Sequence, residues 1–105
     1  DELVYGLHLR ALLFAEELKA AGFQVLNEVV FNQVLVACDT EALTTQTMQN
    51  IQRSGECWVG GANWEGRAVI RVSVCSWVTS EADVSRSVVA FADARDKAVI
   101  DMAVL

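Results

Sequence analysis

The 105-residue sequence contains no proline, only two lysines and a single histidine. Lysine and arginine together number 8 against 14 aspartates and glutamates, which gives a formal net charge of −6 and a pI near 4.6. Contacts to phosphate groups need clustered Lys and Arg side chains. The sequence therefore predicts partners that include neither nucleic acid nor an anionic membrane surface.

Long apolar runs are absent as well. No stretch reaches the roughly 18 uninterrupted apolar residues of a membrane-spanning helix, and the first residues lack the charged-then-apolar layout of a signal peptide. The three cysteines, Cys38, Cys57 and Cys75, form no CxxC pair and lie within apolar runs. This pattern favours buried, reduced thiols over a disulfide framework or a zinc site. We expect a cytoplasmic protein with no membrane partner.

Apolar residues, by contrast, are abundant: 53% of the sequence is hydrophobic and the mean hydropathy is +0.32. A chain of this length forms one domain, so residues 1–105 are predicted to share a single core. The apolar excess predicts surface that a partner covers, and we expect a homo-oligomer. Because the chain opens on Asp1 without a methionine, we expect it to be a segment of a longer polypeptide.

Helical periodicity and strand-like runs alternate in the first half of the chain. A first amphipathic helix is predicted from about residue 4 to residue 21, with Gly22 as its stop. The β-branched and apolar runs Phe23–Asn27 and Gln33–Cys38 predict strands, the second covered on both faces. A second helix is predicted to begin at Asp39 or Thr40, either of which is a good cap, and to end at Ser54-Gly55; its inner stripe is Leu43, Thr47 and Ile51.

A second strand pair is predicted at Glu56–Asn63 and Arg67–Trp77, joined by a preferred three-residue turn at 64–66. The last helix is predicted from Ser80 to about Lys97, with residues 98–105 as a short strand or a frayed extension. The order helix, strand, strand, helix, strand, strand, helix predicts an α+β fold: a small antiparallel sheet with helices packed on one face.

Arg71 interrupts the apolar run of the last predicted strand. Strand alternation places it on the face that the helices leave open. It is either a solvated side chain, with its stem over apolar neighbours, or a fixed donor that recognises a carboxylate or phosphate. With the preferred three-residue turn, Gly61 is on the same sheet face as Arg71, and Trp58 joins the core. With a two-residue turn, Gly60 lies across from it and Trp58 is on its face.

Other chemically interesting residues have structural explanations. His8 has no cysteine or acid partner nearby in sequence, so it is interpreted as non-catalytic. Gly60-Gly61 is too short and wrongly placed for a phosphate-binding loop. The carboxylate pairs fall at predicted helix surfaces or N-termini, and the three tryptophans are interpreted as packing. No catalytic residue and no metal ligand is predicted.

Two stretches carry a resemblance. The segments "VLNEVVFNQVLVAC" (Val25 to Cys38) and "QRSGECWVGGANWEGRAVIRVSVCSWVTSEADVSRSV" (Gln52 to Val88) resemble the C-terminal small domain of the pyridoxal-phosphate-dependent group II decarboxylases, fold-type-I enzymes that include the aromatic amino acid and glutamate decarboxylases. The resemblance covers nearly the whole chain. It implies the C-terminal domain of an amino acid decarboxylase, a carboxy-lyase, that packs on the large domain of the same enzyme and borders its active site.

The same resemblance implies that this chain is not catalytic in isolation. In the family, a lysine of the large domain holds pyridoxal phosphate, and its histidine-lysine pair is missing here, so no cofactor is expected on this chain alone. Arg71 matches an arginine that lies near the substrate carboxylate in glutamate-decarboxylase-like members, and it is the candidate substrate-binding residue of the intact enzyme. Because Cys75-Ser76-Trp77 follows the strand, where glutamate-specific relatives often have Ser-Asn, the amino acid substrate is not identified. The alternative is a free-standing interaction or oligomerisation module derived from that domain.

Overall fold

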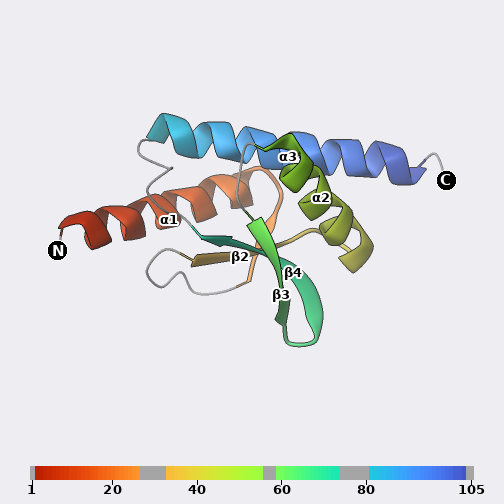
Figure 1. Cartoon of the computed structure of the whole chain (residues 1–105), viewed down its shortest axis with the longest axis horizontal. Coiled ribbons are helices and arrows are strands. Elements are labelled where there is room, and N and C mark those ends of the chain that lie inside the picture. The colour runs from red at the N-terminus through yellow and green to blue at the C-terminus, as the bar shows by residue number, and fades with distance from the viewer. Residues whose placement is uncertain (1, 27–32, 56–58, 74–80, 104–105) are drawn as a thin grey trace.

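The protein folds into a four-stranded antiparallel sheet and three helices (Figure 1). In the computed structural model, the described residues are 2–26, 33–55, 59–73 and 81–103. The elements in chain order are α1 (Glu2–Ala20), β1 (Gln24–Val25), β2 (Gln33–Ala37), α2 (Glu41–Ser54), β3 (Val59–Trp64), β4 (Arg67–Ser73) and α3 (Glu81–Ala103). The predicted α+β class and the predicted order of elements are confirmed.

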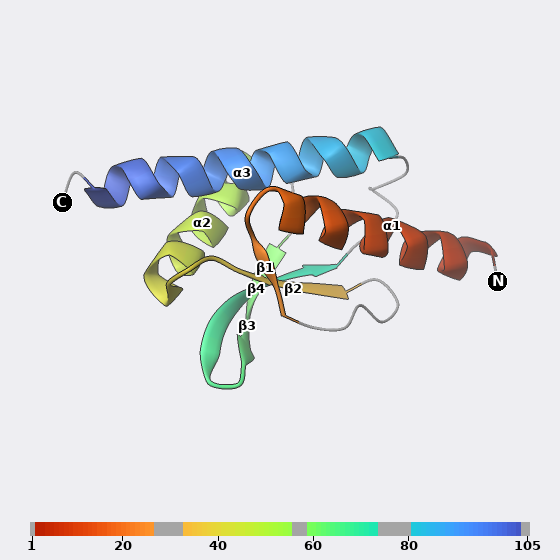
Figure 2. The same cartoon turned by 180° about the vertical axis from the view of Figure 1, so that it is seen from behind.

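The helices lie on one face of the sheet, whose strand order is β1-β2-β4-β3. Helix α1 packs on β1 and β2 and α2 packs on β3 and β4, and Figures 1 and 2, taken from opposite sides, both show α3 running over these two helices as an outer layer. This arrangement leaves the other face of the sheet without helices, as the sequence predicted.

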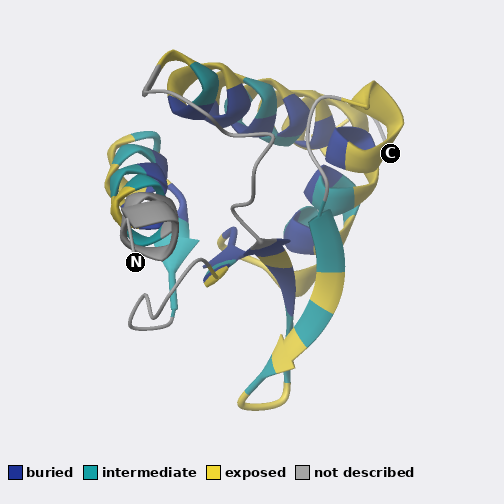
Figure 3. Ribbon diagram, turned by 60° about the vertical axis from the view of Figure 1, so that its left-hand side comes forward, coloured by how far each residue is buried: buried dark blue, intermediate teal, exposed yellow. Residues whose placement is uncertain are grey.

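The core lies between the sheet and the helices (Figure 3). Its sheet side is formed by two directly paired sets of fully buried residues on neighbouring strands, Val34 with Val72 and Val36 with Ile70. On the helix side, the Phe91 ring meets those of Phe14 and Phe23 edge-on, with centroids 5.6 and 5.9 Å away. Strand alternation therefore turns β2 and β4 so that every second residue enters this core.

The strands differ from prediction in their bounds, and β2 also differs in how far its two faces are buried. In the described part of the strand predicted at Phe23–Asn27, residues 23–26, only Gln24–Val25 forms a strand, and β2 ends at Ala37. Leu35 is only half-buried, so β2 is not covered on both faces as its apolar run predicted. The predicted strand residues 56–58 and 74–77 lie outside the described part of the chain.

Local hydrogen bonds cap the C-terminal end of α1 and the N-terminal end of α2. Gly22 has φ +97°, and the amides of Gly22 and Phe23 donate to the carbonyls of Lys19 and Leu18, which is a Schellman end. At α2, the Thr40 hydroxyl accepts a bond from the Leu43 amide at 3.1 Å. The predicted stop at Gly22 and the predicted cap at Thr40 are thus confirmed, and α2 ends at Ser54-Gly55 as expected.

Replacing Thr40 by alanine is expected to lower the free energy of unfolding by about 1 kcal/mol, because the Leu43 amide loses its acceptor. Urea denaturation measures the effect. Thr45→Ala, at an exposed position of the same helix, is the matched control and should change stability by no more than about 0.5 kcal/mol. Equal losses in the two variants would contradict a capping role.

The last helix is longer than predicted. It continues to Ala103, so the short-strand alternative for residues 98–105 is wrong over the described part of that tail. The segment contains neither glycine nor proline to stop it, and Ala98 is fully buried, which ties one more turn to the core. Beyond it, the helix exposes Val99, Ile100 and Met102.

The hairpin between β3 and β4 has a two-residue turn, so the preferred three-residue turn is wrong. Trp64 pairs directly with Arg67, and the turn residues Glu65 and Gly66 have φ of +50° and +83°. Two positive φ values are typical of the primed turns whose twist matches that of antiparallel strands. The prediction placed only the glycine in the left-handed region, whereas Glu65 adopts it as well.

Candidate functional site on the open sheet face

Arg71 lies on β4 in the interior of the sheet, on the face away from the helices. Its neighbours across the two flanking strands are Leu35 on β2 and Gly60 on β3. Because Ile70 and Val72 on either side of it enter the core, Arg71 is turned outward, and its side chain is exposed. The predicted placement on the open face is confirmed.

Gly60 leaves room beside this arginine. A Cβ built at Gly60 would lie 3.6 Å from Nη2 of Arg71, whereas one at Gly61 would meet Sδ of Met48 on α2 at 3.7 Å. Gly61 therefore faces the helices and Gly60 faces the arginine, which is the outcome of a two-residue turn. Trp58, whose face depended on that turn, lies outside the described residues.

The charged residues that the described strands place on this face are both cations. The four strands as described contain no aspartate or glutamate, and their two charged residues, Arg67 and Arg71, lie on the open face four residues apart. Val69 between them is 2% exposed, so the arginine stems rise beside an apolar floor. Within the described part of the chain, the Arg71 guanidinium makes no hydrogen bond or ion pair. An exposed guanidinium on a rigid strand is suited to bidentate recognition of a carboxylate or phosphate.

Sequence reasoning singled out Arg71 but not Arg67. The same alternation rule that placed Arg71 outward also applies four residues earlier, so the signal for a second outward arginine was present in the sequence. Arg67 lies at the hairpin end of the strand opposite Trp64, about 13 Å along β4 from Arg71.

The two lysines are remote from this face. Lys19 lies on α1, where its Nζ is 3.3 Å from Glu16 Oε1 and both side chains are exposed, and Lys97 is exposed on α3. Neither is a buried amine of the kind that is activated for covalent chemistry. His8 is half-buried on α1, away from Arg71.

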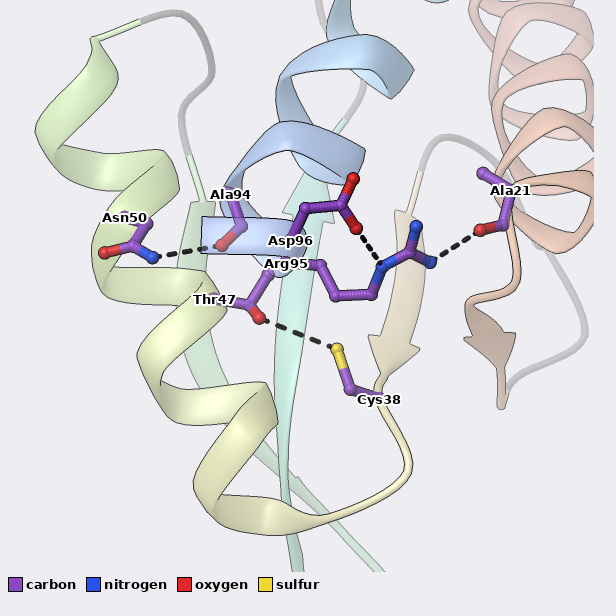
Figure 4. Close-up of polar contacts among 7 residues, drawn as sticks. All are labelled: Ala21, Cys38, Thr47, Asn50, Ala94, Arg95 and Asp96. Atoms are coloured by element: carbon purple, nitrogen blue, oxygen red, sulfur yellow. Dashed lines mark hydrogen bonds and ion pairs between the residues drawn. The ribbon is translucent and has the colours of Figure 1, made fainter. Parts of the chain in front are cut away.

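Cys38 is a structural thiol at the end of β2 (Figure 4). It is 4% exposed; its amide donates to the Thr44 hydroxyl at 2.9 Å, and its Sγ lies 3.7 Å from Thr47 Oγ1. Burial raises the pKa of the thiol, and the bond with Thr47 only partly offsets that rise. A protonated, buried thiol is a poor nucleophile. The prediction of a buried reduced cysteine is confirmed for Cys38, whereas Cys57 and Cys75 lie outside the described residues.

The described residues offer neither a metal site nor a membrane-spanning helix. They contain no group of three or more His, Cys, Asp or Glu side chains placed to hold a metal ion. Their helices also include none that is long and apolar enough to cross a membrane.

Comparison with solved structures shows where this fold occurs. Oryza sativa TDC with PLP and tryptamine superimposes with a TM-score of 0.83 at 16% identity, and Catharanthus roseus tryptophan decarboxylase in complex with L-tryptophan with 0.82 at 16%. Rhodiola rosea 4-hydroxyphenylacetaldehyde synthase gives 0.78 at 19%. The alignments cover 90–91% of this chain but only 22% of each of those chains.

No protein-family model matches the sequence, and no curated protein matches it. At these identities the likeness is one of fold. The chain therefore has the fold of a domain that makes up about a fifth of these larger proteins, in agreement with the resemblance to pyridoxal-phosphate-dependent decarboxylases seen in its sequence.

Proposed function

We propose that this chain is the C-terminal small domain of a pyridoxal-phosphate-dependent amino acid decarboxylase of fold type I, without catalytic activity on its own. The shared fold and the small fraction of each larger chain that it matches support this assignment. The known structures with this fold include one with PLP and tryptamine and one with L-tryptophan, which supports an amino acid with an aromatic side chain as the substrate class.

The observation that carries the proposal is the outward guanidinium of Arg71 beside the vacant position at Gly60. An exposed guanidinium on a strand attracts an anion, and the α-carboxylate of an amino acid is such a group. In the intact enzyme the open face borders the active site, and Arg71 binds and orients the substrate. The cofactor, when bound by the large domain, withdraws the electrons left by the departing carbon dioxide.

Neither lysine of this chain lies on the open face, where the active site is proposed. Lys19 is engaged with Glu16 on a helix surface and Lys97 lies on α3, on the helix side of the sheet. The proposal accordingly assigns the cofactor-binding lysine to the large domain. Exposed leucines on α1, Leu9 and Leu12, are 46% and 40% exposed and provide apolar surface for that domain or for a second subunit to cover.

The test uses the complete polypeptide encoded by the reading frame that contains this chain. We expect it to bind pyridoxal phosphate, to release carbon dioxide from an amino acid, and to lose affinity for that substrate when Arg71 is replaced by glutamine. Loss of a charged hydrogen bond predicts a rise in KM of about tenfold or more.

Arg67→Gln is the matched control, because it removes the same charge from the same face at the hairpin end. A KM that rises equally in both variants would indicate a general effect of charge rather than binding by Arg71. A reading frame that encodes no lysine-bearing large domain would refute the decarboxylase assignment and favour the free-standing interaction module.

A further inference from the structure

A groove on the helix side of the molecule is unconnected with the Arg71 face. It lies between α2 and α3, and its volume of about 510 Å³ falls within the range of small-molecule sites. The groove is on the helix side of the sheet, whereas Arg71 is on the open face. The residues that line it are Asn50, Arg53, Ser54, Arg86, Val89, Ala90, Asp93, Ala94 and Lys97.

The charge of the groove is opposite to that of the chain. Three of the eight Lys and Arg residues of a chain with net charge −6 line it, against one carboxylate, Asp93. Arg53 comes from the last turn of α2 and is exposed. Arg86 lies 3.7 Å from Asp83 through Nη2, but its side chain remains 73% exposed and therefore accessible to a ligand.

The floor of the groove is apolar and short. Val89, Ala90 and Ala94 form it, and Val89 is 58% exposed. From Val89 to Ala94 the helix rises about 7.5 Å, which fits one aromatic ring or a short alkyl chain. A docked helix would need apolar contacts over several turns, so the floor is too short for one. Arg86 lies about one helical turn before this floor, and Lys97 lies about one turn after it.

The two walls are held at a fixed distance by a buried bond. Nδ2 of Asn50 on α2 donates to the carbonyl oxygen of Ala94 on α3 at 3.0 Å (Figure 4). Asn50 is 7% exposed, so this contact is shielded from water. A groove whose walls are already fixed requires little ordering when a ligand binds.

From this geometry we propose that the α2–α3 groove binds a small amphiphilic anion: an aromatic or short-chain body on Val89 and the two alanines, with a carboxylate, sulfonate or phosphate held by the flanking cations. Charge complementarity decides for an anion, because the groove gathers cations in an acidic chain. The site is independent of the proposed decarboxylase function and is present in the chain as it stands.

The probe is the fluorescent aromatic sulfonate 1-anilinonaphthalene-8-sulfonate, titrated into the folded chain at low salt. We expect saturable binding that Arg53→Glu with Arg86→Glu weakens by about tenfold or more, since two attractive charges become repulsive. Val89→Glu should weaken it as well, because it places a carboxylate on the floor. In ¹⁵N spectra of the wild type, the Asn50 side-chain amide should shift with the same saturation curve.

The matched control is the pair Lys19→Glu with Arg67→Glu, which makes the same change of charge at two cations outside the groove and leaves Arg71 in place. Circular dichroism confirms that each variant is folded. Affinity that is unchanged in the Arg53/Arg86 variant, or that falls equally in the control pair, overturns the proposal. An Asn50 amide that does not move while the dye binds also overturns it.

Discussion

Replacing Phe91 by alanine is expected to lower the free energy of unfolding by about 3–5 kcal/mol, the largest loss anticipated for a single residue of this chain. The Phe91 ring is fully buried and packs edge-on against Phe14 from α1 and Phe23 from the segment after it. Its loss opens a cavity where α3 meets α1 and removes two aromatic contacts. Because small domains have only about 5–15 kcal/mol of stability, the variant should be partly unfolded at 37 °C.

Urea denaturation followed by circular dichroism measures this loss. Val89→Ala, two residues earlier on the solvent side of the same helix, is the control and should change stability by no more than about 0.5 kcal/mol. A Phe91→Ala variant as stable as Val89→Ala would mean that α3 does not complete the core.

Replacing Arg95 by alanine is expected to cost about 2–3 kcal/mol, the second largest effect. Nη1 of Arg95 donates to the carbonyl oxygen of Ala21 at the end of α1 (Figure 4). The guanidinium also lies 4.7 Å from the centroid of the Phe23 ring. The carbonyl at the end of a helix is an acceptor that a cation satisfies especially well. Without Arg95, that acceptor loses its partner and the ring loses a cation.

Thermal and urea unfolding at low and high salt test this. Nε of Arg95 also lies 3.3 Å from Asp96, an exposed carboxylate, so Asp96→Ala isolates the surface ion pair. That control should cost about 0–1 kcal/mol and should be the more salt-sensitive of the two. If Asp96→Ala were as destabilising as Arg95→Ala, the contact with Ala21 would not be the source of the effect.

The elements that follow from local rules were predictable from the sequence. Gly22 and Thr40 mark helix ends through hydrogen bonds within a few residues, and both were identified. The outward direction of Arg71 follows from alternation along one strand. The contact of Arg95 with Ala21, by comparison, joins residues 74 positions apart, and no local pattern encodes the packing of α3 on α1 that creates it.

The length of the β3–β4 turn determines which face of the sheet each residue of β3 occupies. Glu65 is not a residue with a preference for positive φ, so its left-handed conformation was not predicted, and a three-residue turn was preferred instead. A register shift of one residue exchanges the two faces of a strand, which is why Gly61 rather than Gly60 was assigned to the face of Arg71. The α2–α3 groove was missed for a different reason: its cations come from two helices whose crossing is set only by the folded core.

The vacancy at Gly60 determines which conformations Arg71 adopts. An alanine methyl at position 60 would meet Nη2 at 3.6 Å, an ordinary contact distance, and would be accommodated. A β-branched side chain would occupy the space that the guanidinium uses and would leave the arginine only rotamers that point elsewhere. The size of the side chain at position 60 therefore limits which rotamers Arg71 can adopt, although Gly60 contributes no chemical group of its own.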